Sequence, residues 1–178
     1  LASLVGVVAG LGAVAFKYMF DAVLAVAWGE VIGILPRSPA GEPEAFAIHP
    51  RGSLALWGLV AMPALGGLLS GIIVNRFAPE AAGHGTDGAI DAFHRNFGII
   101  RRRIPLVKAI SSAITIGAGG SGGREGPIAQ IGAGFGSMLA DVFHLGAKGR
   151  RVLLAAGIGA GVGAIFRAPL AGAVFAAE

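Results

Sequence analysis

The chain has 178 residues, of which 54% are apolar and 13% are charged, with a formal net charge of +4 and no cysteine. A soluble domain carries about 25% charged residues, so this composition excludes an ordinary soluble protein, and the missing thiols exclude a disulfide framework or a thiolate metal site. The 31 glycines lie among aliphatic residues without a three-residue period, which excludes collagen and disorder and favours closely packed membrane helices.

Two long apolar segments come first in the chain, at residues 1–28 and 53–77. Each is long enough to cross a hydrocarbon core of about 30 Å as a helix that rises about 1.5 Å per residue. Lys17 and Asp21 are four residues apart in the first segment, so they can pair on one helix face. Pro63 predicts a kink or a shifted hydrogen-bond ladder in the second.

The stretch between these segments, residues 35–51, predicts an exposed loop because it holds four prolines and four charged residues without periodicity. It carries two arginines, whereas residues 76–108 carry six Lys or Arg. By the positive-inside rule, we expect a multi-pass membrane protein with residues 35–51 outside and residues 76–108 in the cytoplasm. The dense run at 101–103 predicts contact with lipid phosphates, since no aromatic stacking set accompanies it to indicate nucleic acid.

After residue 76 the pattern changes to shorter segments separated by glycine or proline: 88–103, 104–116, 126–145, 148–166 and 169–178. Several are too short to cross a bilayer alone. Broken helices occur at membrane depth where protein or a water-filled cavity surrounds the free backbone groups, and transporters build ion sites in this way. Glycines four residues apart predict close helix contacts, at Gly6 and Gly10, Gly67 and Gly71, Gly132 and Gly136, and Gly157 and Gly161.

The glycine-rich centre of the chain has two interpretations. Residues 117–122 match the GxGxxG pattern, and Asp141 follows at about the distance of a ribose-binding acid, so a dinucleotide-binding enzyme is one candidate. The match is weak in so glycine-rich a chain, and no alternation of strands and helices surrounds it. The second interpretation, which we favour, takes residues 117–127 as the entry into a helix.

A helix that starts in this region provides an anion site. Pro127 fits the first helical turn, and the preceding glycines let the backbone approach a ligand closely. Free N–H groups and the positive end of the helix dipole then converge around Arg124, Glu125 and Gly126. The Glu125 carboxylate can occupy the anion position itself until protonation or a competing anion displaces it. On spacing alone, a glutamate that only caps the helix is an equal alternative.

Residues 123–127, Gly-Arg-Glu-Gly-Pro, resemble a motif of the CLC family of chloride channels and chloride/proton exchangers. The continuation at 128–132 has the family's form. Residues 157–172 resemble its glycine-rich helix and Asn-Ala-Pro-Leu-Ala-Gly segment, with Arg167 in place of the asparagine. The resemblance implies an all-α membrane fold of two inverted-topology halves, each with broken and re-entrant helices. We expect residues 1–178 to be the first half only, a fragment without the second half.

The resemblance also implies a function and partners. It makes the protein an anion transporter and not an enzyme, with Glu125 as its external gate and no cofactor besides the transported chloride. It further implies a homodimer in a lipid bilayer, as in the cell (inner) membrane, with protons as a second transported ion in the exchangers. The family's pore tyrosine and its internal proton-coupling acid fall beyond Glu178. We expect no nucleic acid partner.

One departure from the family lies at residues 83–88, Gly-His-Gly-Thr-Asp-Gly, where the family usually has Gly-Ser-Gly-Ile-Pro-Glu. His84 therefore replaces the anion-contacting serine, and Asp87 replaces the proline that starts the helix. A histidine can still donate a hydrogen bond, and the Thr86 hydroxyl lies two residues away. The departure leaves open a CLC-like transporter for another anion, such as fluoride or nitrate, or a regulatory relative that does not transport.

The candidate site that follows has no catalytic residue and no metal. A metal cluster of His84, Asp87, Asp91 and His94 is not favoured, because no HExxH or comparable signature accompanies these residues. Glu125 is the candidate gate. The candidate anion-binding residues are His84, Gly85, Thr86, Arg124, Glu125 and Gly126.

Overall fold

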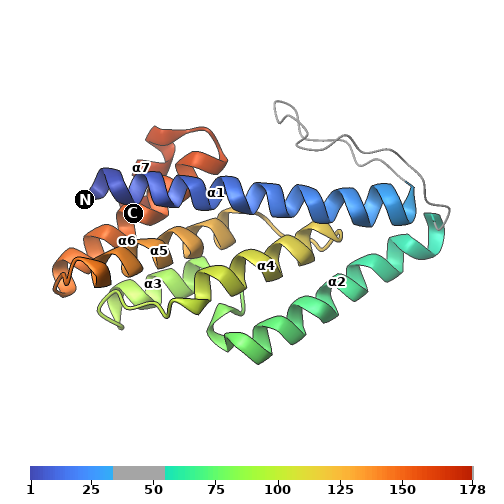
Figure 1. Ribbon diagram of the computed structural model, residues 1–178, viewed down its shortest axis with the longest axis horizontal. Helices are drawn as coiled ribbons and strands as arrows, with labels where there is room; N and C mark the ends of the chain where they lie inside the picture. The colour runs from blue at the N-terminus through green and yellow to red at the C-terminus, as the bar shows by residue number, and fades with distance from the viewer. Residues whose placement is uncertain (34–54, 178) are drawn as a thin grey trace.

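The computed structural model describes residues 1–33 and 55–177, and within them the chain is all helical, without strands. The predicted all-α fold is therefore confirmed (Figure 1). The prediction of a loop at 35–51 lies outside the described residues. The elements are α1 (Ala2–Leu24), the π-helical η1 (Ala25–Ile32), α2 (Ala55–Phe77), the 3-10 turn η2 (Pro79–Ala81), α3 (Thr86–His94), α4 (Arg103–Gly117), α5 (Glu125–Val142), α6 (Ala147–Ile165) and α7 (Pro169–Ala177).

Two helical spans are long and apolar enough to cross a membrane: Ala2–Ile32, with a mean hydropathy of 1.7, and Trp57–Phe77, with 1.8. Most of each span lies on the outside of the bundle. The Lys17 ammonium and the Asp21 carboxylate are 2.5 Å apart within α1, so the predicted pair forms. Because their charges are paired, Lys17 and Asp21 are tolerated inside an apolar span.

The helix α2 continues through Pro63.

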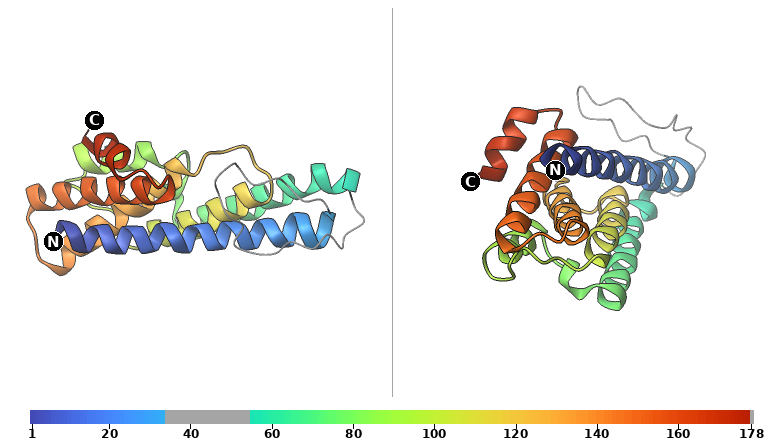
Figure 2. Two further views of the ribbon diagram at one scale, coloured as in Figure 1. Left: turned by 90° about the horizontal axis from the view of Figure 1, so that it is seen from above. Right: turned by 60° about the vertical axis from the view of Figure 1, so that its left-hand side comes forward.

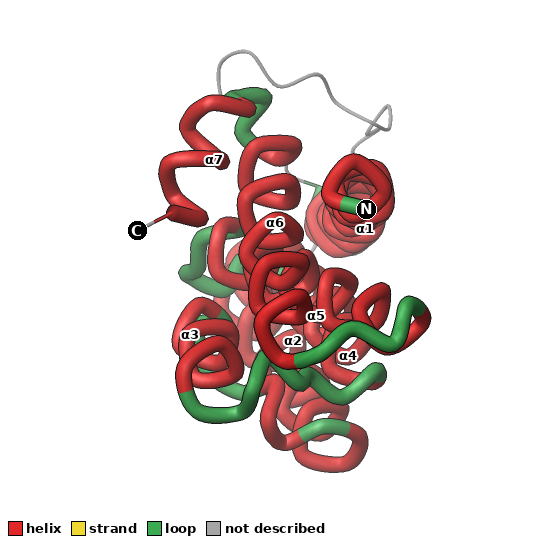
Figure 3. Tube along the Cα trace, turned by 90° about the vertical axis from the view of Figure 1, so that its left-hand side faces the viewer, coloured by secondary structure: helices red, strands yellow, loops and turns green. Residues whose placement is uncertain are grey.

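The helix α5 is the centre of the bundle and contacts α6, α4, α1 and α3 (Figures 1 and 3). Residues 126–134 are buried without interruption because neighbours surround this part of the helix on every side. The helix α7 lies on the outside of the bundle against α6 (Figure 3). The site at the start of α5 is therefore held by the most deeply packed helix in the described part of the chain.

The helices α5 and α6 cross with their backbones in contact. A Cβ atom added to Gly132 would collide with the carbonyl oxygen of Gly157, and one added to Gly157 would collide with that of Gly132. Gly136 meets the backbone of Leu153 in the same way, and a Cβ on Gly161 would lie 3.1 Å from Ile128. The close contacts predicted for these two glycine pairs are confirmed, since only glycine lets two helices approach so closely.

The other two predicted glycine pairs do not make such contacts. Nothing lies within 4 Å of a Cβ placed on Gly6, Gly10, Gly67 or Gly71. These glycines face outward from α1 and α2, so among the described residues no helix reaches them. The prediction of a close helix contact at these four glycines was therefore wrong for the described part of the chain.

Several helices begin or end inside the bundle. The helix α3 has 9 residues, about 14 Å at about 1.5 Å per residue, which is less than half the thickness of a hydrocarbon core. Figure 2 shows that α6 and α7 meet part of the way along α1.

Residues 118–124 form the turn that joins α4 to α5, and the element before this turn is a helix, not a strand. The dinucleotide-binding interpretation of 117–122 is therefore wrong, because its phosphate turn requires a strand before the helix.

Candidate functional site

The helix α5 begins at Glu125, with Arg124 as its N-cap residue and no side chain capping it. Within the helix the first backbone donor is Ile128, which donates to the Arg124 carbonyl at 3.1 Å. Pro127 has no N–H and lies in the first turn, as predicted. The N–H groups of Glu125 and Gly126 thus precede the helix ladder, where the positive end of the helix dipole favours an anion.

The helix α3 begins close to this point. Its N-cap residue is Gly85, which has φ of +111°, and Gly83 two residues earlier has φ of +81°. Only glycine adopts such angles without strain, so the loop requires both residues. Asp87 lies in the first turn, where the helix dipole stabilises its charge. An aspartate therefore follows the start of α3 where the family usually has a proline.

The beginnings of α3 and α5 touch each other. A Cβ on Gly126 would collide with the His84 carbonyl oxygen and come within 2.6 Å of His84 Nδ1, and a Cβ on Gly85 would lie 2.6 Å from the Gly126 carbonyl oxygen. His84 Nδ1 and Thr86 Oγ1 are 3.0 Å apart and share a hydrogen bond. The fold thus gathers His84, Gly85 and Thr86 beside Gly126, although about 40 residues separate them along the chain.

The Glu125 side chain folds back over the turn that precedes its own helix. Its two carboxylate oxygens lie against the position that a Cβ atom on Gly123 would occupy, so a side chain there would displace the carboxylate. The carboxylate is partly buried and sits at the N-terminal end of α5. This is the placement in which a negative charge is most stabilised by the helix dipole and the unpaired N–H groups.

The Arg124 side chain points away from the α3 loop. Its guanidinium lies 5.6 Å from the centre of the Phe20 ring of α1. It lines a cavity of about 150 Å³ together with Lys17 and Arg167. The backbone of Arg124 therefore forms the beginning of α5, while its side chain lies against Phe20 and lines a different cavity from His84.

Lys108 of α4 is part of the site, although the sequence analysis did not select it. The side chain is 3% exposed, and its ammonium donates hydrogen bonds to the carbonyl oxygens of Ala81, at 3.0 Å, and Gly83, at 2.6 Å. Its Cε atom lies 3.1 Å from a Cβ position on Gly85. A lone lysine within an apolar segment was the available signal, because ionisable residues at membrane depth are rarely without function.

A cavity of about 270 Å³ opens beside this loop, between α2, α4 and the turn that leads into α5. Lys108 and His84 line one side. Hydroxyl groups line much of the rest, from Ser70, Ser111, Ser112, Thr115 and Ser121. Such a lining suits a hydrated or partly hydrated small ion. No group of three His, Cys, Asp or Glu side chains in the described part of the chain could hold a metal ion.

Short helices that begin inside a membrane-length bundle and bring their N-termini together form the type of site with which membrane transport proteins hold ions. The family profile described as "Voltage gated chloride channel" matches residues 66–178. This range is more than half of the 178 residues, and the chain belongs to this family of integral membrane proteins, the CLC family.

Similar proteins cover the whole chain. The H(+)/Cl(-) exchange transporter ClcA of Cronobacter sakazakii is 38% identical over 180 residues, which include 100% of this chain and 35% of that protein. ClcA of Yersinia pseudotuberculosis is 37% identical, with 34% of its length covered. The crystal structure of a slow cyanobacterial Cl-/H+ antiporter has a TM-score of 0.72 and 26% identity, with coverage of 96% of this chain and 37% of that one. The CLC-type fold is therefore confirmed, and the chain spans about a third of these relatives.

Proposed function

We propose that the complete protein transports chloride or a similar small anion across a membrane, and that the adjoining beginnings of α3 and α5 form part of the anion pathway. The contact between His84 and Gly126 carries this proposal, because it places two positive helix ends at one point. The buried Lys108 ammonium adds a full positive charge nearby. The names of the relatives, H(+)/Cl(-) exchange transporters, agree with this chemistry.

Glu125 is the gate in this proposal. Its carboxylate lies at the beginning of α5, next to the N–H groups that a bound anion would use. While it is ionised it competes with the anion for these donors, and protonation removes that competition. The same carboxylate therefore gives anion flux its dependence on pH.

The relatives favour exchange of chloride against protons over a simple channel. In this proposal, residues 1–178 form the first of two halves of a multi-pass membrane domain, and the complete protein pairs as a homodimer in the cell (inner) membrane. The covered third of the relatives' length leaves room for a second half of similar size. His84 in place of serine is the one feature that would favour another anion, such as nitrate or fluoride.

The complete protein, purified and reconstituted in liposomes, tests the proposal. We expect chloride efflux from loaded vesicles, and a reversal potential that shifts when a proton gradient opposes the chloride gradient. A reversal potential that follows chloride alone would indicate a channel. Efflux of fluoride or nitrate without chloride would favour the alternative transporter, and the absence of any anion flux from a correctly folded protein would refute transport.

A further inference from the structure

Seven basic side chains gather at one end of the bundle, where α3 and α5 end and α4 and α6 begin. Asp141 of α5 connects this helix to two others. Its carboxylate lies 4.0 Å from the Arg102 guanidinium at the start of α4 and accepts a hydrogen bond from Arg150 of α6. Arg151 of α6 connects to α3, because its Nη2 donates a hydrogen bond to the His94 carbonyl at 3.4 Å. We call this region the basic surface; its residues are Arg95, Arg101, Arg102, Arg103, Lys148, Arg150 and Arg151.

The basic surface carries the whole net charge of the chain. Four of its seven basic side chains pair with three acidic ones, Glu80, Asp91 and Asp141. Counted together, these ten residues have a formal charge of +4. The remaining seven basic and seven acidic residues of the chain cancel. The net positive charge of the chain is therefore equal to the charge of this one surface.

The members of the basic surface differ in what they contact. Arg101 pairs with Glu80 at 2.5 Å, and Arg150 pairs with Asp141, so these charges are largely compensated within the protein. Arg103 and Lys148 are exposed, and the salt bridges within the described part of the chain do not include them. These two side chains are the ones best placed to bind an external anion.

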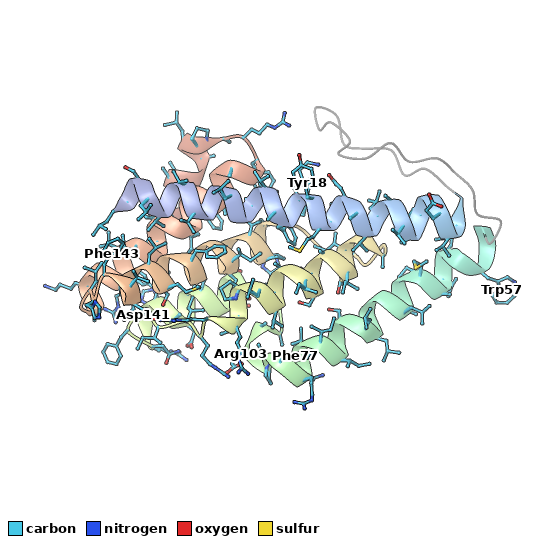
Figure 4. All side chains as sticks on the ribbon, viewed as in Figure 1. Tyr18, Trp57, Phe77, Arg103, Asp141 and Phe143 are labelled. Atoms are coloured by element: carbon cyan, nitrogen blue, oxygen red, sulfur yellow. The ribbon has the colours of Figure 1, made fainter. Side chains whose placement is uncertain are left out.

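Exposed apolar side chains accompany the charges. Phe97 is 61% exposed and Ile99 56% exposed in the connection between α3 and α4, and Phe143 is 42% exposed at the end of α5. The Arg151 guanidinium lies 6.0 Å from the centre of the Phe97 ring. Figure 4 labels Phe143, Asp141 and Arg103 on the side of the molecule away from Trp57. Basic and aromatic residues occur together in this way where a membrane protein meets the headgroup layer.

We propose that the basic surface binds the phosphate headgroups of anionic phospholipids in the cytoplasmic leaflet, with Arg103 and Lys148 as the principal donors. The charge of the surface is complementary to such a leaflet, and the exposed Phe97 and Phe143 side chains reach the acyl boundary beside the phosphates. A soluble polyanion would use the charges but not the exposed apolar side chains. The proposal depends on the membrane location of the family and not on which ion is transported.

The test compares lipid affinity in the complete protein, purified in a neutral detergent. Native mass spectrometry measures binding of phosphatidylglycerol and of phosphatidylcholine to the wild type and to the double variant Arg103→Gln/Lys148→Gln. Each basic residue near an anionic lipid surface contributes about fivefold in affinity, so we expect phosphatidylglycerol to bind about 25-fold more weakly to the variant. Binding of phosphatidylcholine should stay unchanged.

The matched control is the double variant Glu80→Gln/Arg101→Gln, which also changes two residues of this region but leaves the net charge unaltered. It should bind phosphatidylglycerol as the wild type does. Thermal unfolding curves should first show that both proteins are folded. Equal phosphatidylglycerol affinity in the wild type and in Arg103→Gln/Lys148→Gln would then overturn the proposal. So would displacement of the lipid by a short oligonucleotide at a lower concentration than phosphatidylglycerol itself requires, which would assign the surface to nucleic acid.

Discussion

The His84 ring lies directly against the backbone of Gly126, so close that a methyl group on Gly126 would come within 2.6 Å of His84 Nδ1. The ring is held there by its hydrogen bond with Thr86, 3.0 Å long. If Thr86 donates to Nδ1, the opposite ring nitrogen carries a proton and is a donor. His84 can then supply to an anion the hydrogen bond that a serine supplies in most of the family.

His84→Ser should therefore change anion selectivity. The serine hydroxyl lies on a shorter side chain than the imidazole N–H, so it donates from another position and its hydrogen bond suits the two anions differently. A difference of about 1 kcal/mol between them corresponds to about a fivefold change in the ratio of chloride flux to nitrate flux. Flux of both anions through the complete protein in liposomes measures this ratio. His94→Ser, a change of the same kind at the other end of α3, is the control and should leave it unaltered. Identical selectivity in His84→Ser would mean that the ring is only a loop residue.

Glu125→Gln should remove the pH dependence of anion flux while leaving the pathway open. The amide keeps the size of the side chain but has no charge to compete with an anion for the N–H groups of α5. Flux into liposomes between pH 4 and pH 8 measures the effect. Asp91→Asn removes an exposed carboxylate of α3 and should retain the wild-type pH profile. Unchanged pH dependence in a folded Glu125→Gln protein would contradict the gating role.

Lys108→Met should destabilise the protein and slow anion flux. It leaves the carbonyl oxygens of Ala81 and Gly83 without their buried donor, at a cost of about 1–3 kcal/mol for each group. The loop before α3 then loses its anchor to α4. The thermal unfolding midpoint in detergent and the flux rate together measure the effect. Ser112→Ala, which lines the same cavity, should change both much less; equal effects of the two variants would speak against a special role for Lys108.

Gly157→Ala should separate α5 from α6. The added methyl group meets the Gly132 carbonyl oxygen, and overpacking of this kind costs about 1–3 kcal/mol. A lower unfolding midpoint in detergent is the expected result. Gly10→Ala places the same methyl group in α1 with nothing within 4 Å, and it should leave the midpoint unchanged or raise it. If Gly10→Ala lowered the unfolding midpoint and Gly157→Ala did not, the crossing of α5 and α6 would be looser than the structure describes.

Stability should fall in acid through Glu80, in the turn between α2 and α3. A hydrogen bond from its own backbone and the Arg101 guanidinium lower the pKa of Glu80 below 4.5. The carboxylate is thus ionised more readily in the folded state, so its contribution is present above pH 4.5 and is lost as the pH falls through the lowered pKa. For so exposed a pair the contribution is under about 1 kcal/mol. Unfolding midpoints from pH 6 to pH 3 should decline less in Glu80→Gln than in the wild type.

The sequence predicted the positions of the helices because their signals are local. Apolar segments of membrane length, Pro127 near a helix start and glycine before it are all visible without tertiary structure. The positions of α2 and of α4 to α7 differ from the predicted segments by a few residues at most. The GREGP motif then restricted the candidate site to a few residues.

The sequence did not predict which residues contact one another, because this depends on which side of a helix faces a neighbour. Four glycines four residues apart make contacts and four do not, although Gly6 and Gly132 look alike in sequence. The side chain of Arg124 points to α1, and its backbone points to the site. The apolar segment around Lys108 marks it as unusual, but its carbonyl partners lie 25 and 27 residues away and are not indicated by the sequence.

The contact between Gly132 and Gly157 also restricts how the proposed anion pathway can open. Two backbones that touch without side chains between them cannot slide or rotate past one another without first moving apart. The helix that carries Glu125 is thus a fixed support, and the part that can move is the side chain, which folds over Gly123. Rotamer changes of partly exposed side chains take picoseconds to nanoseconds, whereas helix shifts take microseconds or longer. In the proposed function, opening at Glu125 is therefore expected to be limited by protonation and anion arrival, not by rearrangement of the fold.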